Sequence, residues 1–213
     1  MAYEISSQNC MSRWQGSQRR IGLTGGIGSG KSSVGAYLAQ KGLLVLDADE
    51  FSRSALTSNA LLTSEVVAHF GTAIQNPDAS INRRVLGKLI FQDLSARRWL
   101  EQRIHPIVLE QFENNLGRLL PKATVVLMIP LLFEAGMEGL CSEIWLVSCK
   151  FEQQLERLIQ RDKLTYGEAR ARIASQWPIV SKHCLADAVI SNIDTPGCWQ
   201  KQVDRLLSLK LAN

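Results

Sequence analysis

The stretch Gly25-Gly26-Ile27-Gly28-Ser29-Gly30-Lys31-Ser32 is the most informative part of this 213-residue chain. It matches the pattern G-x-x-x-x-G-K-[S/T], with a short apolar run, residues 21–24, before it and helical spacing of apolar residues after it. A strand, a glycine-rich loop and a helix in this order direct backbone N–H groups and a helix N-terminus at phosphate groups. The segment therefore predicts a P-loop that binds the phosphates of a nucleoside triphosphate.

The residue types of the loop indicate separate roles. Lys31 should reach the β- and γ-phosphates, and the hydroxyl of Ser32 should bind the magnesium ion that bridges them. We expect ATP as the nucleotide, because the chain has no Asn-Lys-x-Asp guanine-binding motif. A glycine-rich turn without a ligand is the alternative, but it would require the lysine, the hydroxyl and the flanking elements to coincide by chance. The expected nucleotide contacts are Gly25, Gly26, Ile27, Gly28, Ser29, Gly30, Lys31, Ser32 and Ser33.

Apolar runs elsewhere in the chain predict an α/β fold. Short buried strands are expected at 21–24, 43–46, 124–129, 144–147 and 189–190, and helical patterns separate most of them. Strands alternating with helices favour a doubly wound sheet with parallel pairing. We therefore expect a P-loop NTPase fold with about five parallel strands flanked by helices, a helical substrate lobe and a lid.

Composition shifts suggest how these parts are arranged along the chain. Residues 1–19 are polar and aperiodic, which predicts a flexible tail before a single domain over residues 20–213. The core of that domain is expected at about 20–55, 120–150 and 185–213, a helical lobe at about 56–119 and a lid at about 151–184. Within the lobe, Pro106 is expected to end one helix and begin the next.

Two carboxylates, Asp47 and Asp49, follow the second predicted strand. This position is the carboxyl edge of the sheet, where open α/β folds bind ligands. Exposed or helix-capping acids are the ordinary interpretation, but beside a P-loop one of them is expected to act as the base that deprotonates an accepting hydroxyl.

Basic residues are concentrated on two predicted helices after residue 150. Two interpretations remain open, a solvated face or a lid whose arginine stabilises the γ-phosphate during transfer. A histidine in the helical lobe, His105, is more typical of a helix end or a core than of a catalyst. The basic residues in question are Arg157, Arg161, Lys163, Arg170 and Arg172.

Charge and hydropathy argue against other partners. A net charge of +4 without a run of Lys or Arg gives no reason to expect nucleic acid. The longest apolar run, residues 125–133, is too short to span a membrane, and no secretory signal is visible, so a cytoplasmic protein is expected. The five cysteines are scattered and form no Cys-x-x-Cys pair, which argues against a zinc or redox site.

Taken in order, several segments resemble the dephospho-CoA kinase family, over roughly residues 21–207. The segments are residues 23–32, Asp47-Ala48-Asp49, Arg84-x-Leu86 with Ile90-Phe91, His105-Pro106, Pro130-Leu131-Leu132-Phe133-Glu134 and Gln160-Arg161-Asp162. The resemblance implies an ATP- and magnesium-dependent enzyme that phosphorylates the ribose 3′-hydroxyl of dephospho-CoA to give coenzyme A and ADP. It also implies that the helical lobe binds the acceptor, and we expect a monomer or weak homo-oligomer.

The same resemblance implies residue roles. Asp49 is the expected base, Lys31 and Arg161 stabilise the γ-phosphate, and Ser32 is the magnesium ligand. Two differences from the family pattern are Asp194 in place of a glycine and Trp177 in place of a methionine. The other implied positions are Arg157 and Asn192 on the nucleotide, and Arg84, His105, Pro130 and Leu131 with Asp49 on the acceptor side.

Two rival functions remain. Another small-metabolite or nucleoside monophosphate kinase would use the same P-loop with a different acceptor. A non-catalytic nucleotide-binding switch would bind the nucleotide without transferring its phosphate. The predicted strand 124–129 does not end in an acidic residue, so the sequence gives this switch little support. Release of ADP that depends on an acceptor distinguishes the kinases from the switch.

Overall fold

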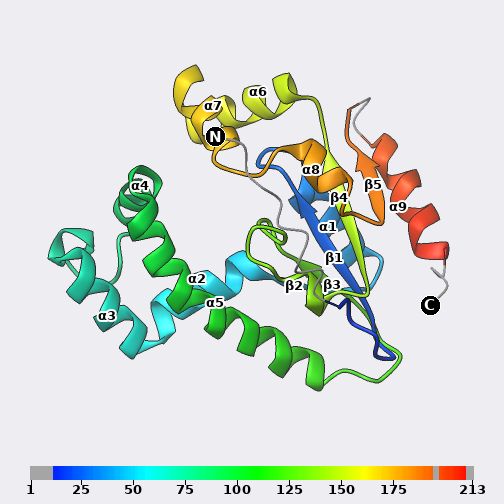
Figure 1. Ribbon diagram of the computed structural model, residues 1–213, viewed down its shortest axis with the longest axis horizontal. Helices are drawn as coiled ribbons and strands as arrows, with labels where there is room; N and C mark the ends of the chain where they lie inside the picture. Colours follow the sequence, from blue (N-terminus) through cyan, green and yellow to red (C-terminus); the bar gives the residue numbers. More distant parts are fainter. Residues whose placement is uncertain (1–11, 194–196, 210–213) are drawn as a thin grey trace. The chain divides into compact units, whose positions relative to one another are not determined.

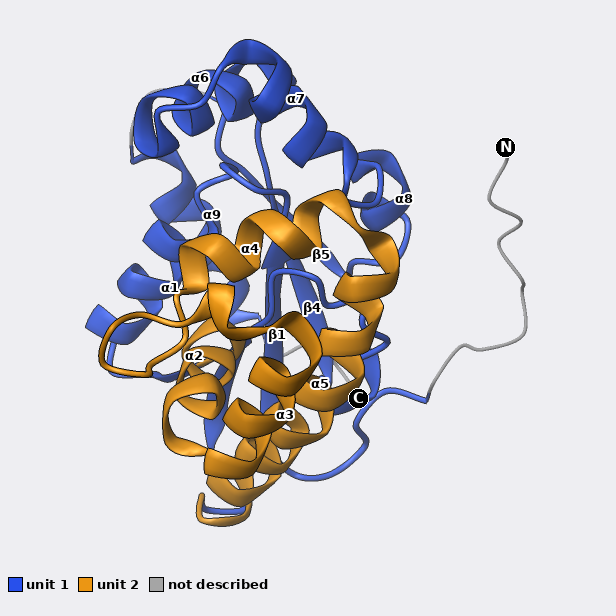
Figure 2. Ribbon diagram, turned by 90° about the vertical axis from the view of Figure 1, so that its left-hand side faces the viewer, with its two compact units in different colours: residues 1–46, 120–213 blue, residues 47–119 orange. Residues whose placement is uncertain are grey.

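The structure is a computed structural model that describes residues 12–193 and 197–209. The chain falls into two compact units, residues 1–46 with 120–213 and residues 47–119 (Figure 2). Residues 1–11 of the expected tail and Asp194 lie outside the described residues.

The first unit is built on one five-stranded sheet with strand order β2-β3-β1-β4-β5 (Figure 1). The central strand β1 pairs in parallel with β3 and β4, and β4 pairs in parallel with β5. The expected number of strands, their positions and their parallel pairing are confirmed. The strands are β1 (Arg19–Gly25), β2 (Leu44–Asp47), β3 (Thr124–Met128), β4 (Glu143–Ser148) and β5 (Ala188–Ser191).

Both faces of this sheet are covered, which explains why β4 reads as a continuous apolar run. Helices α1 (Lys31–Gln40) and α9 (Cys198–Ser208) cover one face, and α9 runs beside β5 (Figure 1). Helix α8 (Ile179–His183) packs against β4, and a short 3-10 turn, Glu138–Leu140, precedes that strand. The core under α1 and α9 contains Ile21, Leu23, Val34, Leu38, Trp145, Val147, Trp199 and Val203.

Helices α6 (Phe151–Asp162) and α7 (Tyr166–Ala174) follow β4 and form a small apolar cluster of their own. Leu155, Leu158 and Ala169 are its buried members. Thr165 and Glu168 form a capping box that begins α7. The α6–α7 pair lies within the segment for which the sequence predicts a lid.

The second unit consists of helices. Helix α2 (Ala48–Ser58) and α3 (Ala60–Phe70) are followed by a 3-10 turn, Thr72–Ile74, and by α4 (Arg83–Gln92) and α5 (Leu94–Gly117). The expected helix break at Pro106 is wrong, because α5 continues through it. Proline removes one backbone hydrogen bond there. Leu100, Ile104, Val108, Phe112 and Leu116, spaced by four residues and buried on both sides of Pro106, keep the helix on its core.

Residues 12–18 contact other parts of the first unit. The backbone N–H of Trp14 donates to the carbonyl of Cys141 at 3.0 Å, and Arg13 forms an ion pair with Asp187 at 3.0 Å. In the part of the chain that the structure describes, no helix combines the length and apolar character needed to cross a membrane.

Candidate active site

The loop between β1 and α1 adopts backbone conformations that need glycine. Gly28 and Gly30 have φ angles of 75° and 97°, in the left-handed region that L side chains rarely adopt. A Cβ atom at Gly30 would also lie 2.3 Å from Nδ2 of Asn192, and one at Gly26 would lie 2.5 Å from Nε2 of Gln154. The turn therefore requires glycine at positions 28 and 30, and a Cβ at Gly26 or Gly30 would displace a side chain that contacts the loop.

Side chains from outside the loop hold three consecutive carbonyl groups. Nε2 of Gln154 donates to the carbonyl of Ile27 at 2.8 Å, and Nη1 of Arg157 donates to that of Gly28 at 3.1 Å. Nδ2 of Asn192 donates to the carbonyl of Ser29 at 2.8 Å. In a planar trans peptide the C=O and the following N–H point in opposite directions. The outer contacts therefore direct the N–H groups of Gly28 and Gly30 to the inner side of the loop, where a phosphate binds.

The first turn of α1 suits an anion. It contains Lys31, Ser32 and Ser33 and no acidic side chain, so nothing offsets the partial positive charge of the helix N-terminus. The hydroxyl of Ser29 is buried and has no hydrogen-bond partner among the described residues. These features fit the phosphates of ATP. Within residues 12–193 and 197–209 no cluster of three or more His, Cys, Asp or Glu could hold a metal ion by itself.

Arg157 and Asn192, expected on the nucleotide, both hold the P-loop backbone instead of projecting away from it. Arg157 also approaches the carbonyl of Ser29 at 3.4 Å, so the two side chains meet at one peptide group. Their direct contact with a nucleotide stays a prediction.

Arg161 is paired on the surface of α6. Its Nε donates to Oδ1 of Asp162 at 2.8 Å, and Nη1 of Arg172 on α7 donates to Oδ2 of the same carboxylate at 2.8 Å. The hydrogen bond from Arg161 holds the pKa of Asp162 below its ordinary value. Its side chain is 62% exposed, so Arg161 is a surface cation, and its reach to a γ-phosphate stays a prediction.

The segment after β3 lies beside the P-loop strand. Thr24, the residue before the loop, donates through Oγ1 to the carbonyl of Pro130 at 3.1 Å. Leu131 follows, and its carbonyl accepts the N–H of Ala135 at 2.8 Å in a tight turn. Pro130 and Leu131 thus belong to the same unit as the P-loop, and their contact with an acceptor stays a prediction.

Three expected acceptor-side residues, Asp49, Arg84 and His105, belong to the helical unit. Oδ1 of Asp47 accepts the N–H of Asp49 at 2.8 Å, so Asp47 caps α2. Asp49 is exposed in the first turn of that helix. Arg84 is exposed in the first turn of α4, and His105 is half-buried within α5. Asp47 is therefore the helix-capping residue of the two carboxylates, and Asp49 remains the candidate base.

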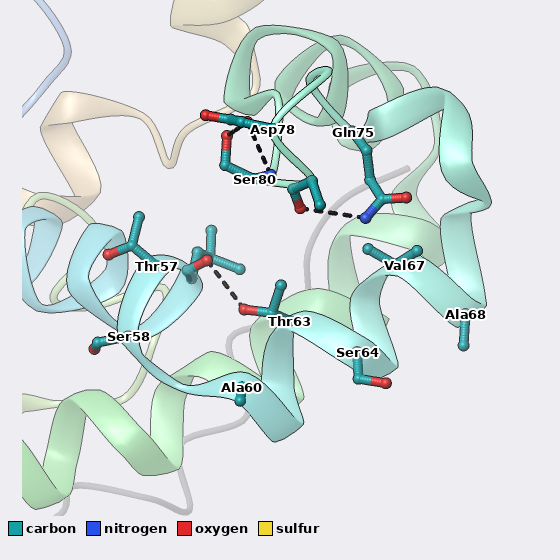
Figure 3. Close-up of a pocket in the computed structure, with 12 residues that line it drawn as sticks. Thr57, Ser58, Ala60, Thr63, Ser64, Val67, Ala68, Gln75, Asp78 and Ser80 are labelled. Carbon is teal, nitrogen blue, oxygen red and sulfur yellow. Dashed lines mark hydrogen bonds between the residues drawn. The ribbon is translucent and has the colours of Figure 1, made fainter.

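The helical unit also contains a cavity of about 710 Å³ that the sequence did not indicate. Hydroxyl and amide groups line it, as Figure 3 shows for Thr63 and Gln75. Asp78 is its charged lining residue, and hydrogen bonds from the Ser80 hydroxyl and N–H hold the pKa of Asp78 below its ordinary value. The cavity lining therefore carries one negative charge, that of Asp78.

A sequence profile described as dephospho-CoA kinase matches residues 19–196, which include every candidate site residue above. The chain belongs to the dephospho-CoA kinase family. The resemblance seen in the ordered motifs is thus confirmed, and the protein is a kinase with a P-loop NTPase fold.

Curated relatives and solved structures align with most of the chain. The dephospho-CoA kinase of Synechococcus sp. (strain CC9605) is 55% identical over 194 residues, which are 91% of this chain and 94% of that protein. A crystal structure from Thermus thermophilus has 31% identity and a TM-score of 0.77, covering 92% of this chain and 99% of that one. The dephospho-CoA kinase of Campylobacter jejuni has 27% identity and a TM-score of 0.65, covering 89% and 96%.

Sequence reasoning missed Gln154 and Gln176, which both contact Ile27 in the P-loop of this family member. The chain order gives no sign of which residues meet, because 127 and 149 residues separate the partners. One signal was present for Gln154. It is a polar residue on the apolar stripe of α6, next to Leu155 and Leu158.

Proposed function

We propose that the protein transfers the γ-phosphate of ATP to the ribose 3′-hydroxyl of dephospho-CoA, giving coenzyme A and ADP, the last step of coenzyme A biosynthesis. Family membership supports the acceptor. The observation that carries the donor site is the set of carbonyls held at Ile27, Gly28 and Ser29, since it directs the N–H groups of Gly28 and Gly30 to the side where the phosphates would bind.

The proposed roles follow from charge and proton transfer. Lys31 and Arg161 stabilise negative charge on the transferring group, and Asp49 accepts the proton of the 3′-hydroxyl. Ser32 would hold Mg²⁺ through its hydroxyl, together with water and phosphate oxygens. This account agrees with the lack of a ready-made cluster of metal-binding side chains among the described residues. Bound Mg²⁺ supplies charge neutralisation between the phosphates.

We assign the acceptor to Asp49, Arg84, His105, Pro130 and Leu131. The helices at about 56–119 form the acceptor-binding lobe in this proposal, and the segment at about 151–184 forms the lid. Arg157 and Asn192 serve the nucleotide by aligning the P-loop in addition to any direct contact.

We also propose that the enzyme acts in the cytoplasm, where ATP is supplied, as a monomer or weak homo-oligomer with no nucleic-acid partner. A net charge of +4 without a basic run supports the last point. Size-exclusion chromatography with light scattering over a range of protein concentrations measures the oligomeric state.

The test is a coupled assay of ADP release with purified protein, ATP, Mg²⁺ and dephospho-CoA, in which the product is identified as coenzyme A by mass spectrometry. Omission of dephospho-CoA, addition of EDTA and the variant Lys31→Ala should each abolish most turnover. ADP release that ignores the acceptor would support a nucleotide switch. Turnover with nucleoside monophosphates or small hydroxy acids but not with dephospho-CoA would support another kinase.

A further inference from the structure

Ile27, in the P-loop, is bound through its backbone and its side chain by the segment 151–184. Its N–H donates to Oε1 of Gln176 at 2.8 Å, and its carbonyl accepts from Nε2 of Gln154 at 2.8 Å. Its side chain packs on the apolar cluster of α6 and α7. The P-loop is therefore attached to these helices at Ile27.

The chemistry of the two contacts is unambiguous. A backbone N–H can only donate and a carbonyl can only accept, so Gln176 must present its amide oxygen and Gln154 its amide nitrogen. Gln154 is only 7% exposed, and a Cβ atom at Gly26 would lie 2.5 Å from its Nε2 and 3.9 Å from Oε1 of Gln176. Both glutamine side chains thus lie against Gly26 and fix the Ile27 backbone from two sides.

This arrangement sets which loop amides can face a phosphate. Gln176 accepts the N–H of Ile27, so this N–H cannot bind a phosphate. Gln154 binds the carbonyl of Ile27 on the outer side of the loop and so directs the N–H of the next residue, Gly28, inward. Preorganised amides stabilise developing charge because they need not reorient during the reaction.

We propose that Gln154 and Gln176 are positioning residues for phosphoryl transfer, which orient the P-loop amides through the backbone of Ile27. The proposal rests on the proposed function, because it assumes that the loop binds the phosphates of ATP. Neither glutamine needs to touch the nucleotide.

Neutral variants of similar size test the proposal. Gln154→Met and Gln176→Met remove the polar group, and Gln40→Met, at an exposed glutamine at the end of α1, is the control. The loss of one hydrogen bond predicts that kcat/KM for ATP falls about three- to tenfold in each P-loop variant. The KM for ATP should rise while the KM for dephospho-CoA stays unchanged, whereas a smaller folded fraction would lower kcat alone and leave both KM values unchanged. Thermal unfolding of each variant is measured in parallel.

Two glutamate variants separate the loss of a hydrogen bond from a general effect of substitution at these positions. Gln176→Glu keeps an acceptor for the Ile27 N–H, whereas Gln154→Glu replaces a donor by an acceptor and sets a carboxylate against a carbonyl oxygen. Each adds one negative charge beside the same residue. We expect Gln176→Glu to retain at least tenfold more kcat/KM for ATP than Gln154→Glu.

The outcomes distinguish this inference from the proposed function. An inactive wild-type protein would overturn the kinase assignment. Calorimetric titration would then still compare the ATP affinities of the variants, which depend on how the loop amides are oriented. Methionine variants within twofold of Gln40→Met in ATP affinity and turnover, or a Gln154→Glu variant as active as Gln176→Glu, would overturn the role of the glutamines. If Gln154→Met does not fold, the comparison of Gln176→Met with Gln176→Glu decides.

Discussion

The ammonium of Lys182 is completely buried and lies 2.6 Å from Oε1 of Glu134. Glu134 belongs to the turn after β3, and Lys182 to α8, so this ion pair joins two segments that follow different strands of the sheet. The same carboxylate oxygen accepts the N–H of Trp177 at 3.0 Å. One carboxylate thus connects the Pro130–Glu134 motif to the end of the segment 151–184.

Loss of one partner of this pair should destabilise the protein strongly. Lys182→Met leaves the Glu134 side chain, which is only 12% exposed, without its counter-charge, and we expect about 3 kcal/mol less stability in urea unfolding. The double variant Lys182→Met with Glu134→Leu should recover most of that loss, because it removes both charges. Lys201→Met, at an exposed lysine of α9, is the control. A single variant as stable as this control would show that the ion pair contributes little.

Gly30 and Gly42 offer a matched test of the loop geometry. Both have positive φ, 97° and 86°, so alanine introduces similar backbone strain of about 1–2 kcal/mol at each. Only at Gly30 would the Cβ meet another side chain, Nδ2 of Asn192 at 2.3 Å, while nothing lies within 4 Å at Gly42. Gly30→Ala should therefore lower ATP affinity at least tenfold, as measured by calorimetry, and Gly42→Ala should lower only stability. Equal ATP affinities would contradict the role of the Asn192 contact.

The Asp162 carboxylate predicts a pH-dependent link between α6 and α7. Because Arg161 lowers its folded-state pKa, its contribution to stability is present above the unfolded-state pKa and is lost as pH falls through the folded-state pKa. Asp162→Asn should thus be less stable than the wild type at about pH 7, and the two should converge below about pH 4. Urea unfolding at several pH values measures the difference. Glu156→Gln, an exposed change on the same helix, should show no such convergence.

The sheet could be predicted from the sequence because each buried strand is a short apolar run bounded by polar residues or glycine. The run 144–147 is an example, since both faces of β4 are covered and no polar alternation interrupts it. The helix through Pro106 could not be predicted, since its stability comes from packing of residues on both sides of the proline and not from local propensity. The five-residue helix α8 was also missed.

The P-loop was evident from its own residues, but its supports were not. Arg157 was expected on the nucleotide, and the structure adds a contact that the sequence did not indicate, from its Nη1 to the carbonyl of Gly28, 129 residues away in sequence. The contacts of Gln154 and Gln176 with Ile27 were not expected either, because they depend on how α6 and α7 fold back. Spacing along the chain reveals motifs that are contiguous, whereas contacts between distant segments require the fold.

Asp47 and Asp49 provide the decisive test of the proposed base. Asp47→Asn keeps an acceptor for the N–H of Asp49, because asparagine caps helices as well as aspartate does, and its kcat should remain near the wild-type value. Asp49→Asn keeps the shape of the side chain but removes the proton acceptor, so kcat should fall at least about 100-fold. Binding of ATP, measured by calorimetry, should be unchanged in both variants. If Asp49→Asn raises only the KM for dephospho-CoA, the residue binds the acceptor and another group takes the proton.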